Sequence, residues 1–168
     1  MGRFLRLVMA LLLCWLWGCS SPSPPPASMS YLDLAAKQTH IRNTLATLET
    51  FHRTARDLRT RPAPEAQQEL RTETRRYVEL QVRPVITDFE ANHSVKTQLD
   101  LAQLELLCGL VYLELQDYSG ALATFDNLKK RYGDRTELLT ATLDRRFVDF
   151  DHLGAGMDYL DQRLSLEY

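Results

Sequence analysis

The sequence predicts an all-α protein built from antiparallel helical hairpins. From Tyr31 onward, apolar residues recur at intervals of three and four residues, which is the period of one face of an α-helix. They almost never recur at intervals of two, so no strand is predicted. Clusters of proline, serine and asparagine separate the periodic segments, and we interpret them as turns between helices.

Two long helices are predicted first, over residues 31–58 and 64–92. Ser30 is placed to cap the first helix, and Pro64 suits the first position of the second. Pro84 lies inside the second helix, where it removes an internal hydrogen bond, so we expect a kink or a break near Arg83.

Four further helices are predicted after residue 94. The third and the fourth occupy residues 95–132, with Ser94 as a cap and Asp117 at the turn between them. A capping signal at residues 134–137 opens a fifth helix over residues 135–150, and a sixth follows over residues 154–164. We therefore expect a single helical domain over residues 31–168, long enough to bury a core.

The segment GLVYLELQDYSGALATF, residues 109–125, resembles a tetratricopeptide repeat. Counted from Ala102, positions 8, 11, 17, 20 and 24 of the repeat hold Gly109, Tyr112, Tyr118, Ala121 and Phe125. The resemblance implies one repeat over residues 102–135, in which the glycine and the alanine are small where two helices cross and the aromatic side chains fill the surrounding space. It also implies a degenerate second repeat over residues 136–168, and a right-handed stack preceded by the two long helices.

Repeats of this family bind other proteins, and the first helix of each repeat lines the concave face. By the family's pattern, that face carries the partner-binding candidates Gln103, Leu106, Leu110, Leu113 and Glu114. The three leucines form an apolar strip, and the alternative is that this strip packs against the second long helix.

The N-terminus predicts export followed by lipid anchoring. Two arginines precede the uncharged run of residues 7–17, which has the length of a signal-peptide core and is too short to span a bilayer. The stretch LWGC, residues 16–19, resembles a bacterial lipobox, which implies removal of the signal peptide of residues 1–18 and lipidation of Cys19. Ordinary secretory cleavage and a retained N-terminal anchor are the alternatives.

A linker is predicted between the lipidated cysteine and the helices. Residues 19–30 continue after Cys19 as SSPSPPPASMS, and this proline- and serine-rich composition favours an extended spacer. Ser20 is not the aspartate that resembles an inner-membrane retention signal, so we expect a location at the outer membrane, facing the periplasm.

Charge is unevenly distributed along the chain. Residues 37–83 carry ten Lys and Arg against six Asp and Glu, whereas residues 88–168 carry eight against fifteen. The basic residues are interpreted as solvated helix faces, with contact to anionic lipid headgroups or an acidic partner as the alternative.

No motif of catalysis or of metal binding is found. The four histidines are scattered, and His152 is expected to pack or to cap a helix. Cys108 lies in the apolar run of residues 104–115 and is expected to be a buried, unreactive side chain. We therefore expect no enzyme, cofactor, metal or small-molecule substrate, and no nucleic acid, because the mature chain is net acidic.

Together these patterns predict a lipid-anchored, tetratricopeptide-like adaptor or assembly factor that binds other proteins of the bacterial cell envelope. By resemblance, such proteins serve secretins, pili, outer-membrane insertion machines or motor-associated rings. The alternative is a structural subunit whose helices pack permanently into a larger envelope complex.

Overall fold

The computed structural model describes residues 31–61, 63–89, 91 and 94–167, without the side chains of residues 31–34. The predicted signal peptide, Cys19, the linker and Ser30 lie outside the described residues. Residues Ala35–Tyr168 form one compact unit. Among the described residues the structure is all-helical apart from turns and an isolated β-bridge between Thr142 and His152, as the sequence predicts.

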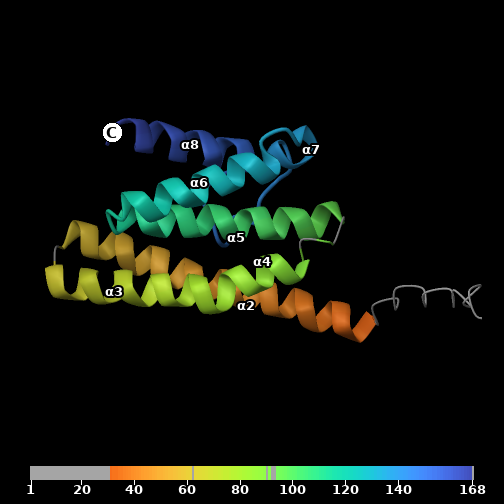
Figure 1. The fold of residues 1–168 in the computed structure, drawn as a ribbon, viewed down its shortest axis with the longest axis horizontal. Coiled ribbons are helices and arrows are strands. Elements are labelled where there is room, and N and C mark those ends of the chain that lie inside the picture. The colour runs from red at the N-terminus through yellow and green to blue at the C-terminus, as the bar shows by residue number, and fades with distance from the viewer. Residues whose placement is uncertain (1–30, 62, 90, 92–93, 168) are drawn as a thin grey trace, which may run out of the picture. The chain divides into compact units, whose positions relative to one another are not determined.

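In the part of this unit that the structure describes, there are six α-helices of more than one turn and one π-helical turn. They are α2 (Tyr31–Thr60), α3 (Pro64–Tyr77), η1 (Val78–Val82), α4 (Arg83–Phe89), α5 (Val95–Glu114), α6 (Tyr118–Tyr132) and α8 (Leu153–Ser165), and the single turn α7 (Thr136–Leu139) precedes α8. Within the unit, α2 runs antiparallel to the continuous helix α3–η1–α4, and α5 runs antiparallel to α6 (Figure 1).

The second predicted helix does not break at its proline. Pro64 opens α3 as expected, and the helix continues to Phe89 through the π turn that precedes Pro84. The N–H of Arg83 donates to the carbonyl of Val78, five residues earlier, which widens the turn. The wider turn changes the position of the carbonyls that the proline ring would otherwise meet.

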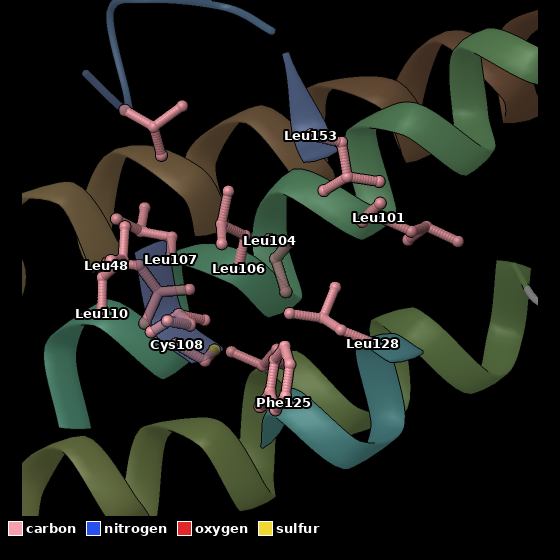
Figure 2. Packing of buried hydrophobic residues seen from close by; sticks show 14 of the residues in the cluster. Leu48, Leu101, Leu104, Leu106, Leu107, Cys108, Leu110, Phe125, Leu128 and Leu153 are labelled. Atoms are coloured by element: carbon pink, nitrogen blue, oxygen red, sulfur yellow. The ribbon is translucent and has the colours of Figure 1, made fainter. Parts of the chain in front are cut away.

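Helix α5 is the centre of the core. Every residue from Leu101 to Leu113 is buried, because the sequence of this helix is apolar on nearly all sides and other helices cover each side. Leu48 of α2, Leu128 of α6 and Leu153 of α8 belong to the same cluster as the leucines of α5 (Figure 2). Cys108 is part of this cluster, so its predicted burial is confirmed.

Ser94 caps α5 as predicted, and Asp117, which was predicted to lie at the turn, caps α6. The Ser94 hydroxyl accepts a hydrogen bond from the N–H of Thr97, and the Asp117 carboxylate accepts one from the N–H of Gly120. Between the two helices, Gln116 has a φ of 57°, and the N–H of Asp117 donates to the carbonyl of Tyr112. This is a Schellman-type end with glutamine in the left-handed position, where glycine is the usual residue.

The predicted helix over residues 135–150 is wrong. Only the single turn α7 forms, and residues 140–152 are non-helical. The buried Gln103 side chain of α5 forms two hydrogen bonds with this segment. Its Nε2 donates to the carbonyl of Asp144 at 2.7 Å, and its Oε1 accepts from the N–H of Asp144 at 3.2 Å. The backbone of Asp144 is thereby paired with a side chain instead of with a helical neighbour.

The predicted last helix is confirmed as α8, and His152 caps it by accepting a hydrogen bond at Nδ1 from the N–H of Ala155. Two glycines let α8 approach α5. A Cβ on Gly156 would lie 2.5 Å from Leu106, and a Cβ on Gly109 would lie 2.9 Å from Leu160. Gly109 is therefore small chiefly because of α8, and not because of the α5–α6 crossing that the repeat pattern implies.

Candidate functional site

The sequence-predicted binding strip on α5 is not a surface. Gln103, Leu106, Leu110 and Leu113 are each at most 3% exposed. The only member that is not buried, Glu114, forms an ion pair with Arg59 of α2 at 3.0 Å. A partner cannot reach these side chains in this fold, so their assignment as partner-binding residues is corrected to core packing.

The second long helix, α3–η1–α4, does not cover the whole of this strip either. Gln103 binds the segment after α7, Leu106 contacts Gly156 of α8, and Glu114 pairs with α2. The remaining repeat residues lie in the core, where Tyr112, Ala121 and Phe125 are buried and Tyr118 is half-buried.

A different site lies on another side of α5, in the groove between the helix α3–η1–α4 and α6. Its volume is about 490 Å³. The apolar part of its lining comes from three elements and comprises Val78, Val82, Ile86, Cys108 and Tyr112. One wall is formed by α6, whose lining residues Ser119, Gly120 and Ala123 are small. We call this the α6 groove.

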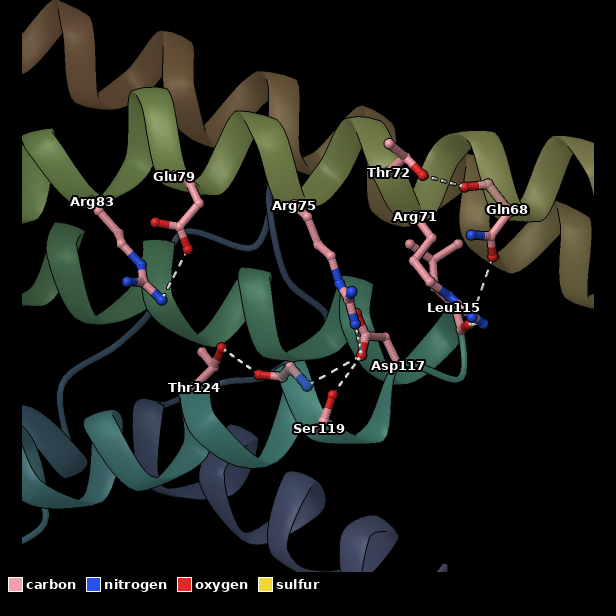
Figure 3. A network of polar contacts seen from close by, with 11 residues as sticks. Gln68, Arg71, Thr72, Arg75, Glu79, Arg83, Leu115, Asp117, Ser119 and Thr124 are labelled. Atoms are coloured by element: carbon pink, nitrogen blue, oxygen red, sulfur yellow. Dashed lines mark hydrogen bonds and ion pairs between the residues drawn. The ribbon is translucent and has the colours of Figure 1, made fainter.

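One end of the α6 groove is closed by an ion pair between the two walls. Arg75 of α3 donates from Nε and Nη2 to the two carboxylate oxygens of Asp117, at 2.7 and 2.8 Å (Figure 3). The Asp117 carboxylate also accepts from the Ser119 hydroxyl and from the N–H of Gly120. Burial acts to raise the pKa of Asp117, but these hydrogen bonds outweigh it, with that from Arg75 foremost, and hold the pKa below its usual value.

Two more arginines border the α6 groove. Arg83 pairs with Glu79 at 3.1 Å, and both side chains project from their helix toward the α6 side (Figure 3). Arg131 of α6 pairs with Glu105 of α5 at 3.2 Å near the opposite end from Asp117. The groove thus has an apolar floor and three guanidinium groups at its edge.

The floor of the groove is chemically inert. Burial, together with the charge of Glu105, raises the pKa of the Cys108 thiol far above its usual value, so the nucleophilic thiolate is disfavoured. Burial likewise raises the pKa of Tyr112. Both residues belong to the core cluster that lies beneath the groove.

A second, smaller hollow lies between α2 and the segment after α7. Four arginines border it, and each has a carboxylate partner: Arg53 with Glu49, Arg56 with Asp149, Arg145 with Asp151 and Arg146 with Asp144. His52 also lines this hollow, and burial lowers its pKa. Of these pairs, Arg56–Asp149 joins the non-helical segment to α2, and the other three lie within α2 or within the segment.

The described part of the chain holds no group of three His, Cys, Asp or Glu side chains that could bind a metal ion. Of the helices that the structure describes, none combines the length and the apolar character of a membrane span.

The residues of the α6 groove were missed by the sequence analysis, although its capping aspartate and its tyrosine were singled out for other reasons. Their signal is the regular spacing of Val78, Val82 and Ile86 beside small residues on α6, but no local pattern says that these two segments face each other. Comparisons with family models, with curated proteins and with solved structures find no match to this chain.

Proposed function

We propose that this chain is a lipid-anchored helical adaptor that binds another protein of the bacterial cell envelope through the α6 groove. Lipidation at Cys19 would hold it at the outer membrane, on the periplasmic side, and the linker of residues 19–30 would separate the helical unit from the bilayer. A tetratricopeptide-type stacking of the hairpins belongs to the same proposal.

The observation that carries the proposal is the α6 groove itself. It combines a volume of about 490 Å³ with an apolar floor and a charged edge, which is the usual composition of a site that buries part of another molecule. Two of the ion pairs at its edge, Arg75–Asp117 and Arg131–Glu105, join different helices, so the groove is formed by the fold before a partner arrives.

The adaptor is favoured over a permanently packed subunit by the rest of the described surface. The large apolar side chains exposed there are few and come from four different elements: Leu80, Val95, Leu122 and Leu166. An obligate interface is larger and more apolar than this. Isolated exposed side chains of this kind are ordinary on a soluble surface.

Site-specific photo-crosslinking in intact cells tests the proposal. Ala123 is exposed on the α6 wall of the groove, and Ala46 is exposed on α2 and does not line it. A photoreactive residue in place of Ala123 should yield a discrete crosslinked product with another envelope protein, whereas the same residue at position 46 should not.

A groove-filling variant completes this experiment. Ala123→Trp should abolish the crosslinks formed from a neighbouring groove position such as Asn127, while Ala46→Trp should leave them unchanged. Equal crosslinking from positions 46 and 123, or crosslinks that survive Ala123→Trp, would remove the α6 groove as the partner site.

A further inference from the structure

The dimensions of the α6 groove suit a short helix. Its two walls are the stretches Arg75–Thr87 and Ser119–Arg131, which run in the same direction (Figure 1). Each stretch spans twelve residue steps, or about 18 Å at the rise of an α-helix. That length matches about three turns of a helix lying along the groove.

The small side chains of the α6 wall allow such a helix to approach closely. Ser119, Gly120 and Ala123 line the groove from α6, so little side-chain bulk separates the helix backbone from the floor. A Cβ on Gly120 would lie 3.0 Å from the ring of Tyr112, so the absence of a side chain there lets α6 pack closely on the floor. The close approach is limited to this end of the groove, because farther along α6 the lining residues Asn127 and Arg131 are bulkier.

The charges at the edge of the α6 groove indicate which charges a partner should carry beside its apolar face. Asp117 and Glu105, which pair with Arg75 and Arg131, are 3% and 7% exposed and lie beneath their arginines. The arginines are nearer to solvent, with Arg75 56% exposed and Arg83 64% exposed. Of the carboxylates that line the groove, Glu79 is the one that is exposed. The outermost charges are thus mostly cationic.

We propose that the occupant of the α6 groove is an amphipathic helix of another protein, with apolar side chains on one face and carboxylates beside that face. Its apolar side chains would lie over Val78, Ile86 and Tyr112, the floor residues nearest to the surface, and its carboxylates would meet Arg75 and Arg83. This is recognition of a helix in a groove with complementary charge at the edge. The inference rests on the proposed function, because it names the partner's chemistry at the same site.

Two synthetic helices serve as probes. Both are fourteen-residue, fluorescently labelled amphipathic peptides with leucines at helical spacing, and they differ only in carrying glutamates or lysines beside the leucines. The full chain, purified in detergent, should bind the glutamate peptide about tenfold more tightly in a fluorescence anisotropy titration, and added salt should reduce this preference.

The chain offers a matched pair of variants for this titration. Glu79–Arg83 and Glu49–Arg53 both join residues four apart on a helix, with the arginine exposed in each, and only the first pair borders the α6 groove. Arg83→Glu should weaken binding of the glutamate peptide about fivefold to tenfold and strengthen binding of the lysine peptide. Arg53→Glu should change neither affinity.

The outcomes separate the two proposals. A lysine peptide that binds as well as the glutamate peptide, or an Arg83→Glu variant that behaves like Arg53→Glu, overturns the acidic helix. Crosslinks from position 123 in cells would then still support the groove as a partner site. If neither peptide binds and those crosslinks are also absent, both proposals fail.

Discussion

Asp117 joins the parts of the chain that form the α6 groove. Its carboxylate caps α6 through Gly120, and it accepts two hydrogen bonds from Arg75 of α3. One buried side chain thus fixes the start of a helix and the distance between the groove walls. Removing it would leave an exposed arginine without its partner and an uncapped helix end.

Asp117→Asn isolates the charge, because asparagine keeps an oxygen for the cap. We expect the free energy of unfolding to fall by about 1–2 kcal/mol at neutral pH. The pKa of Asp117 is lower in the folded chain than in the unfolded chain. The stabilisation is therefore complete above about pH 4, the ordinary pKa of aspartate, and is lost as the pH falls through the lowered pKa of the folded state.

Urea denaturation of both proteins between about pH 2 and pH 7 measures this difference. The difference in free energy of unfolding between Asp117→Asn and the unsubstituted chain should disappear at the acidic end of this range. Asp126→Asn, at an exposed aspartate of the same helix, provides the control and should follow the unsubstituted chain throughout. A gap for Asp117→Asn that does not depend on pH would contradict the role given to its charge.

At the scale of the helices, spacing decides what the sequence can predict. The helices α2, α5, α6 and α8 were predictable because their apolar faces recur at three and four residues and their caps are local. The non-helical segment of residues 140–152 was not predictable, because the buried residues Leu138 of α7, Leu143, Val148 and Leu153, the first residue of α8, lie at intervals of five. That interval fits no helix face, and the bonds from Gln103 that hold the segment come from a distant part of the chain.

The π turn η1 has a similar explanation. Leu70, Thr74, Val78, Val82 and Ile86 are all buried and lie exactly four residues apart. In an α-helix each step of four turns the side chain by about 40° beyond a full turn, so a long series of such steps leaves the core. A π turn rotates less per residue and returns the series to the same face. The π turn therefore keeps Val78, Val82 and Ile86 together on the face that forms the floor of the α6 groove.

Deletion of Gln81, an exposed residue of η1, tests this account. The deletion restores α-helical spacing to the buried residues, but it places the ring of Pro84 against a carbonyl of a regular helix. We expect a loss of about 3 kcal/mol in the free energy of unfolding. Combining the deletion with Pro84→Ala should recover most of that loss in chemical denaturation. A double variant as unstable as the deletion alone would show that the extra residue is needed for another reason.

At the scale of the whole molecule, local patterns predicted the helices but not the site. The α6 groove takes its lining from α3, η1, α4, α5 and α6, and two of the ion pairs at its edge, Arg75 with Asp117 and Arg131 with Glu105, join residues more than twenty positions apart. The strip that the repeat pattern favoured became core, because α5 lies between other elements on all sides. Only packing decides which side of a helix remains open.

Anchoring involves a part of the chain outside the described residues, and it rests on residues 16–19. Cys19→Ala should prevent lipidation and move the protein from the membrane fraction to the soluble fraction, because attachment then lacks its acyl chains. Circular dichroism should remain that of a helical protein, since residues 35–168 form their own compact unit. Crosslinking from position 123 should decrease if the partner is held at the membrane.

Cys14→Ala is the matched control for this experiment, because it makes the same substitution within the predicted signal peptide. It should leave the mature mass and the membrane fraction unchanged, since that residue is removed during maturation. Mass spectrometry of the purified proteins checks both variants and locates the mature N-terminus. A Cys19→Ala protein that keeps its mass and its membrane association would refute lipid anchoring and favour a retained signal segment. Release of the unsubstituted protein without any lipid would instead indicate ordinary secretory cleavage.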